Sequence, residues 1–154
     1  MPTYEISLIP ADMLWQPAPA AAAEAETCVR EFYSKHEESV EEVSVKYCDR
    51  IMVVQPGLNL SRITCPECEG DIPLDWYWEF LVRHGEEVDS IDVTAPCCGT
   101  ATSLDALLYD APAGYARFKV VAVNPSRADE LTAEELATVA TVLGHPLRQV
   151  FGFW

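Results

Sequence analysis

The chain has 154 residues, of which 49% are hydrophobic, and this is enough apolar material for one domain, residues 1–154, with its own core. Its formal net charge of −15 excludes electrostatic attraction to nucleic acid or to an anionic membrane surface, and leaves a basic protein partner compatible. No apolar run reaches about 18 residues, and the first 29 residues contain neither Lys nor Arg, so we expect neither a membrane span nor a secretory signal. We therefore expect a cytoplasmic protein whose cysteines stay reduced.

The N-terminal third of the chain predicts a strand, a helix and a second strand. Residues 3–9 alternate in part between apolar and polar side chains and stop at Pro10, which is typical of a short strand. Residues 20–35 carry apolar side chains at helical spacing and indicate an amphipathic helix. Residues 43–54 alternate and then become continuously apolar, which favours a strand.

The C-terminal part repeats this order of elements. Residues 116–125 predict a strand, and residues 131–144 predict a helix in which Thr132 and Glu135 have the spacing of a capping box. Residues 147–154 predict a final strand. The two strand-helix-strand units agree in order only, because no residue-level repeat relates them.

The middle segment, residues 60–109, contains four of the six cysteines and a different set of elements. We expect a helix through residues 76–84, a strand at 90–94, and a brief helix at 104–109 capped by Ser103.

The four cysteines of this segment lie in two short stretches. Cys65 and Cys68 have Cys-Pro-x-Cys spacing, which supplies two sulfurs to a tetrahedral zinc ion. The second stretch, Ala-Pro-Cys-Cys-Gly-Thr, fits the same template if Ala95 stands in the place of the first cysteine and Cys97 supplies the missing sulfur. Neighbouring side chains of a regular strand point to opposite faces, so this stretch must be irregular if Cys97 and Cys98 bind one ion. We expect one structural Zn²⁺ site.

These cysteines resemble those of zinc ribbons, and a Cys-x-x-Cys pair followed by Cys-Cys is similar to the small zinc-bundle subunit of archaeal and eukaryotic RNA polymerases. The resemblance covers residues 65–98 and implies that Cys97 and Cys98 both bind the metal. It implies no polymerase function, because this chain is acidic where the polymerase subunit is basic. The chain as a whole resembles an uncharacterised bacterial zinc-binding protein.

Two other uses of the cysteines remain open. A redox Cys-x-x-Cys pair would normally begin a helix, but Glu67 and Glu69 flank Cys68 and oppose thiolate formation. A catalytic zinc would need an open coordination position, with Cys98 alone binding from the second pair and water or His84 completing the site. The sequence also lacks the full signature of zinc deaminases, in which a His-x-Glu is followed by Pro-Cys-x-x-Cys.

The densest aromatic stretch is Trp76, Tyr77, Trp78 and Phe80. A helix turns by about 100° per residue, so these four side chains cannot share one face, and at least one is expected to face outward or into a partner. Two interpretations stay open: an interaction surface formed by all four residues, or a cap over the zinc turns.

These patterns predict an α+β fold in which two strand-helix-strand units form a mainly antiparallel sheet. Its element order resembles a ferredoxin-like sandwich, and residues 60–109 are an inserted zinc-ribbon and helical segment. For function, we expect a zinc-stabilised, non-enzymatic protein-interaction module. The alternatives are an acidic immunity or inhibitor protein that neutralises a basic partner, and a zinc metalloenzyme.

Overall fold

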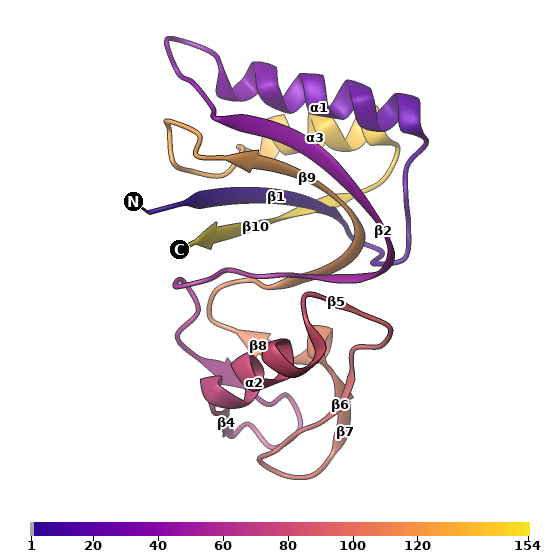
Figure 1. The fold of residues 1–154 in the computed structure, drawn as a ribbon, viewed down its shortest axis with the longest axis vertical. Coiled ribbons are helices and arrows are strands. Elements are labelled where there is room, and N and C mark those ends of the chain that lie inside the picture. Colours follow the sequence, from indigo (N-terminus) through magenta and orange to yellow (C-terminus); the bar gives the residue numbers. More distant parts are fainter. Residues whose placement is uncertain (1) are drawn as a thin grey trace.

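The computed structural model describes residues 2–154 and has a mixed α/β architecture in which all paired strands are antiparallel apart from one isolated bridge. Figure 1 shows two layers of helix and sheet in one half of the molecule and a smaller assembly of short elements in the other. The helices of the described chain are α1 (Pro19–Tyr33), α2 (Leu74–His84), α3 (Ala133–Leu143) and the single 3-10 turn η1 (Leu104–Ala106). None of them is long and apolar enough to cross a membrane.

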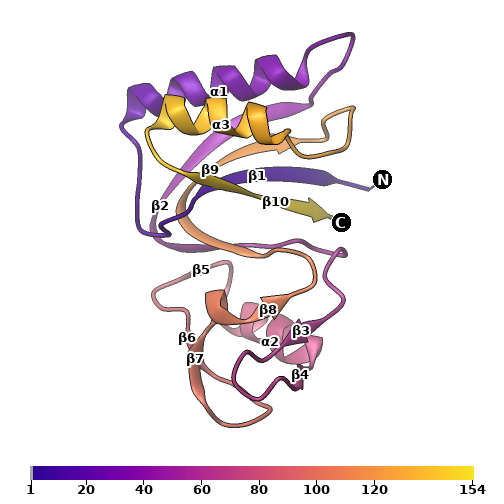
Figure 2. The ribbon, with the colours of Figure 1, turned by 180° about the vertical axis from the view of Figure 1, so that it is seen from behind.

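The larger half is a five-stranded sheet with α1 and α3 packed side by side on one face (Figures 1 and 2). Its strands, in spatial order, are β10 (Leu147–Phe153), β1 (Tyr4–Pro10), β9 (Gly114–Val123), β2 (Glu42–Val54) and β5 (Glu87–Val88). The predicted terminal elements are therefore present, with bounds that differ by a few residues. Alternate side chains of β1, such as Ile6 and Leu8, are fully buried beneath the helices, which explains their period of two.

The helix α3 begins and ends as its sequence predicts. The Thr132 side chain accepts a hydrogen bond from the Glu135 amide, and the Glu135 side chain accepts one from the Thr132 amide, so the capping box is complete. Gly144 follows the helix with φ 85°, a left-handed conformation that glycine adopts without steric cost.

The smaller half is formed by residues between β2 and β9. Its strands are β3 (Ile63–Thr64), β4 (Asp71–Ile72), β6 (Asp92–Thr94), β7 (Ala101–Ser103) and β8 (Leu108–Tyr109). The order β4-β3-β8 makes one small sheet, and β6-β7 makes a hairpin. The brief helix predicted at 104–109 was too long: it is the single turn η1, after which the chain enters β8, and the Ser103 side chain hydrogen-bonds Asp105 rather than a backbone amide.

The smaller half has its own hydrophobic cluster, which we call the lower core. It packs residues of α2 and the short strands against the bent ends of β2 and β9. Its buried members are Ile51, Val53, Leu60, Ile63, Cys65, Ile72, Tyr77, Leu81, Val88, Ile91, Ala95, Leu104, Leu107 and Tyr115. Because Cys65 and Ala95 belong to it, the two cysteine stretches are anchored in this core.

Candidate metal centre

The two cysteine stretches form turns with the same backbone hydrogen bonds. In the first, the Cys65 amide donates to the Gly70 carbonyl at 2.9 Å and the Glu69 amide donates to the Cys65 carbonyl at 3.0 Å. In the second, the Ala95 amide donates to the Thr100 carbonyl at 2.9 Å, and the Gly99 amide donates to the Ala95 carbonyl at 2.8 Å. Ala95 therefore stands where Cys65 stands, as the template predicts.

The backbone of both turns needs a left-handed residue at the same place. Glu69 has φ 62° and Gly99 has φ 74°. Each residue follows the last cysteine of its turn, and the left-handed conformation reverses the chain so that the next residue can pair with the first residue of the turn. The prediction of an irregular conformation at the adjacent cysteines is confirmed, because Cys97 and Cys98 lie in a turn rather than a strand.

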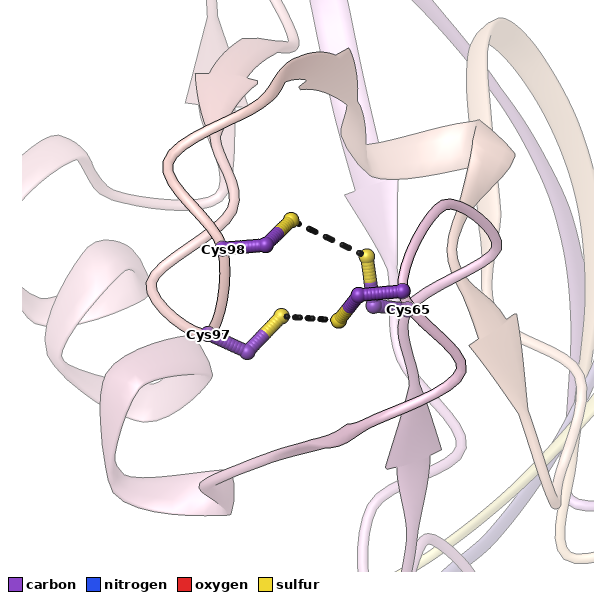
Figure 3. Close-up of side chains that lie close together, drawn as sticks. Cys65, Cys97 and Cys98 are labelled. Atoms are coloured by element: carbon purple, nitrogen blue, oxygen red, sulfur yellow. Dashed lines mark hydrogen bonds between the residues drawn. The ribbon is translucent and has the colours of Figure 1, made fainter.

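The turns bring four sulfur atoms together. The Sγ atoms of Cys65, Cys68, Cys97 and Cys98 all lie within 4.8 Å of one another. Figure 3 shows Cys97 and Cys98 pointing from one turn toward the turn of Cys65. The Sγ of Cys65 is 3.9 Å from that of Cys98, and the Sγ of Cys68 is 3.3 Å from that of Cys97. This arrangement can hold a metal ion.

The four cysteines differ in exposure. Cys65 is fully buried in the lower core, whereas Cys68, Cys97 and Cys98 are exposed. The cluster of four cysteines therefore lies at the surface of the smaller half, and the side chain of Cys65 extends into the hydrophobic interior. The position equivalent to Cys65 in the second turn is also fully buried and holds the smaller Ala95.

Neighbouring donors and thiols set the acidity of the second pair. Hydrogen bonds with Thr100, whose Oγ1 lies 3.3 Å from the sulfur, lower the pKa of Cys98 to about 7. The hydrogen bond with Cys68 and the crowding of the other thiols raise the pKa of Cys97 to about 12. Four thiolates repel one another at these distances, so a divalent cation is what allows all four to ionise together.

The first turn also supports its exposed sulfur through the backbone. The Gly70 amide donates to Cys68 Sγ at 3.4 Å. A Cβ at Gly70 would lie 3.2 Å from Cys68 Sγ, which is tighter than an ordinary contact, so the absence of a side chain there leaves room for this sulfur.

The aromatic residues of α2 do not share one environment. Tyr77 is fully buried in the lower core, where a partner cannot reach it. Trp76, Trp78 and Phe80 are half-buried and pack against that core. The expectation of a contact surface therefore applies to these three residues and not to Tyr77.

Other predicted candidates lie outside the cluster. Among the described residues, the group that could hold a metal contains the four cysteines and does not include His84. The His84 ring instead packs against Phe80, with ring centroids 4.5 Å apart. Cys28 and Cys48 are partly buried and separate from the cluster of four cysteines.

Val82 is an exposed apolar residue of α2 that is not among the residues predicted from the sequence. Its side chain is 88% exposed, more than any other large hydrophobic residue among residues 2–154. It lies one helical turn after Trp78, and both line a shallow depression of about 360 Å³ on α2 together with Asp75, Glu79 and Arg83. The i, i+4 spacing of Trp78 and Val82 could have revealed this outward stripe, because it lies about 100° around the helix from the inward stripe of Tyr77 and Leu81.

No protein-family model, curated protein or solved structure matches this chain.

Proposed function

We propose that the four cysteines bind one structural Zn²⁺ ion. The observation that carries the proposal is the approach of all four Sγ atoms to within 4.8 Å of one another. A tetrahedral site with Zn–S bonds of about 2.3 Å separates its sulfurs by about 3.8 Å, and the 3.3 and 3.9 Å distances lie on either side of that value. Four thiolate ligands leave no open position, which favours a structural over a catalytic role.

Cobalt substitution tests this proposal, because Co²⁺ reports its number of thiolate ligands by its absorption. The wild type should show a four-sulfur spectrum, whereas Cys97→Ser and Cys98→Ser should each show three sulfurs. Cys28→Ser is the matched control and should leave the spectrum unchanged. A four-sulfur spectrum in Cys97→Ser would contradict the ligand set, and an open three-sulfur site in the wild type would favour a metalloenzyme.

The fold proposal is a single ferredoxin-like domain with a zinc ribbon inserted at residues 60–109. The order β10-β1-β9-β2 supports the first part, since numbering these strands along the chain gives 4-1-3-2 with antiparallel neighbours. The two matching turns support the second part, because paired cysteine turns that face each other are the basis of a zinc ribbon. The contacts of β2 and β9 with the lower core support one domain.

We propose that the protein is a non-enzymatic protein-interaction module of the cytoplasm and that the metal stabilises it. The exposed stripe of α2 carries this proposal: Val82 and the half-buried Trp78 form an apolar centre, and Asp75, Glu79 and Arg83 form a charged rim. Aromatic anchors surrounded by polar groups are typical of protein contact surfaces. The inward stripe of α2 packs on the lower core with Cys65, so a bound metal would fix the position of the exposed stripe.

The test is quantitative affinity purification from cell extract with the wild type, Val82→Asp and Trp78→Ala as baits. A specific partner should be retained by the wild type and lost at least about tenfold with either variant. Leu14→Asp is the matched control, because Leu14 is a similarly apolar residue that is 58% exposed and lies outside α2. Equal recovery on all four baits would contradict the α2 surface.

A second candidate function depends on charge. The net charge of −15 favours an acidic immunity or inhibitor protein that neutralises a basic partner. Such complexes associate faster at low ionic strength because the opposite charges attract at a distance. Association of a basic partner at a rate independent of salt would contradict this candidate.

A further inference from the structure

A polar groove lies on the face of the large sheet that α1 and α3 do not cover. Figures 1 and 2 show β2 and β9 curving round so that the C-terminal half of β2 passes beneath β1 and β10. This bend coincides with the irregular pairing between Tyr47 and Met52. The space enclosed has a volume of about 400 Å³, within the range of small-molecule sites. Its lining includes Glu5, Ser7 and Lys119 from the sheet.

Lys119 is an unusual residue on this face. Its cross-strand neighbour in the register of β2 and β9 is Lys46, and like charges directly opposite each other destabilise a sheet. Lys46 forms an ion pair with Glu87 at 3.2 Å, but none of the ion pairs among residues 2–154 includes Lys119. Burial and the proximity of Lys46 lower the pKa of Lys119. The groove therefore contains an ammonium group without a direct counter-charge.

The same groove contains two carboxylates that form no ion pair with any other residue of the range 2–154. Glu5 lies on β1 two residues from Ser7 and lines the groove on its sheet side. Glu86 lines the opposite side, where its carboxylate accepts a hydrogen bond from Gln55 at 2.9 Å and its backbone carbonyl accepts one from the Val53 amide at 2.7 Å. Both carboxylates attract Lys119 at a distance, but neither lies within 4 Å of its ammonium group.

The indole of Trp154 forms an aromatic wall at the groove. Two glycines give it room: a Cβ at Gly152 would lie 2.6 Å from an indole carbon, and one at Gly57 would lie 3.0 Å from another. Trp154 is 43% exposed and contributes to the groove lining. It offers an apolar surface on which a ligand side chain can pack.

From this arrangement we propose that the groove binds a small zwitterion of the free amino-acid type. The ligand carboxylate pairs with Lys119, its ammonium group pairs with Glu5 or Glu86, and its side chain packs on Trp154. A simple anion satisfies only Lys119 and meets repulsion from the two carboxylates, whereas a simple cation meets repulsion from Lys119 and Lys46. A zwitterion supplies both missing charges at once.

The experiment titrates the zinc-loaded protein with each of the twenty L-amino acids and follows amide and indole signals by NMR. At least one amino acid should give saturable shifts at Lys119, Ser7 and the Trp154 indole. For that ligand, the N-acetyl form and the carboxamide form should each bind at least about tenfold more weakly, because each lacks one charge.

Variants locate the site independently of ligand chemistry. Lys119→Met should weaken binding at least about tenfold, whereas Lys35→Met, which removes a lysine of the α1 end, should not change it. Lys119→Arg keeps the positive charge and should restore measurable binding. Binding by Lys119→Arg would show that position 119 tolerates substitution, so that the loss in Lys119→Met reflects the lost charge and not unfolding. The proposal is overturned if no amino acid gives saturable shifts up to its solubility limit. It is also overturned if neither blocked form binds more weakly, or if binding is the same in Lys119→Met.

Discussion

Cys65 and Ala95 hold equivalent positions in two turns that fold alike. The amide of each donates to the carbonyl five residues later at 2.9 Å, the carbonyl of each accepts from the amide four residues later, and both side chains are fully buried. The second turn thus has the backbone of a cysteine turn, but its cysteine stands at the third position instead of the first.

This equivalence predicts that a cysteine at position 95 can replace Cys97 as a metal ligand. The double variant Ala95→Cys with Cys97→Ser should restore a four-sulfur cobalt spectrum that Cys97→Ser alone has lost, because a thiol at position 95 starts from the same backbone geometry as Cys65. Zinc affinity, measured by competition with a chromophoric chelator, should recover in parallel. A three-sulfur spectrum in the double variant would show that the lower core cannot turn this thiol toward the metal.

Removal of zinc should loosen the smaller half and spare the larger one. The smaller half depends on strands of two or three residues, whereas the sheet and its two helices have a separate buried cluster. Hydrogen exchange followed by mass spectrometry should show lost protection in α2 and in residues 92–103 after chelation, with β1 and β9 still protected. Unchanged exchange in α2 would contradict a structural role for the metal.

The left-handed residues predict opposite effects of two substitutions. Glu69→Gly should raise the free energy of unfolding by up to about 1 kcal/mol, because it relieves a side chain at φ 62°. Gly99→Ala should lower it by about 1 to 2 kcal/mol, and this cost is purely backbone strain because an added Cβ has no neighbour within 4 Å. Urea unfolding at saturating zinc measures both. Equal effects of the two changes would show that the turns relax independently of φ.

The capping box of α3 predicts a loss of stability in acid. Burial alone would raise the pKa of Glu135, but the hydrogen bonds from Arg127 and Thr132 outweigh it and hold the pKa below its ordinary value. Because the folded pKa is the lower one, this stabilisation is complete above the unfolded pKa of about 4.3 and is lost as the pH falls through the folded pKa.

Glu135→Gln should therefore be less stable than the wild type by about 1 kcal/mol at pH 7, and the difference should shrink below about pH 4. Urea unfolding from about pH 7 to below about pH 4 measures the difference in the free energy of unfolding. Both proteins lose zinc in acid, so this loss cancels when the two free energies are subtracted. Glu134→Gln, a change at the exposed neighbouring position, is the control and should follow the wild type. A difference that persists at low pH would assign the effect to packing.

Local chemistry made much of the molecule predictable. Capping residues and apolar periodicity located α1, α2, α3 and the long strands, because these signals act within a few residues of each other. The short strands β3, β4, β5 and β8 were missed, since two residues carry no periodic pattern, and β5 and β8 also pair with strands that are far away in the sequence. The brief helix predicted at 104–109 was too long because Leu108 and Tyr109 pair with β3, a strand far away in the sequence, instead of continuing the helix.

The sequence by itself determined the candidate metal-binding cysteines, because cysteine spacing and the place of Ala95 in the second stretch are visible along the chain. Only the tertiary structure decided which side chains are available to a partner or a ligand. Tyr77 is buried and Val82 exposed because the lower core selects one face of α2. Lys119 meets Glu5 and Trp154 in one groove because β2 and β9 bend, and such a bend depends on how separated strands pair rather than on any local pattern.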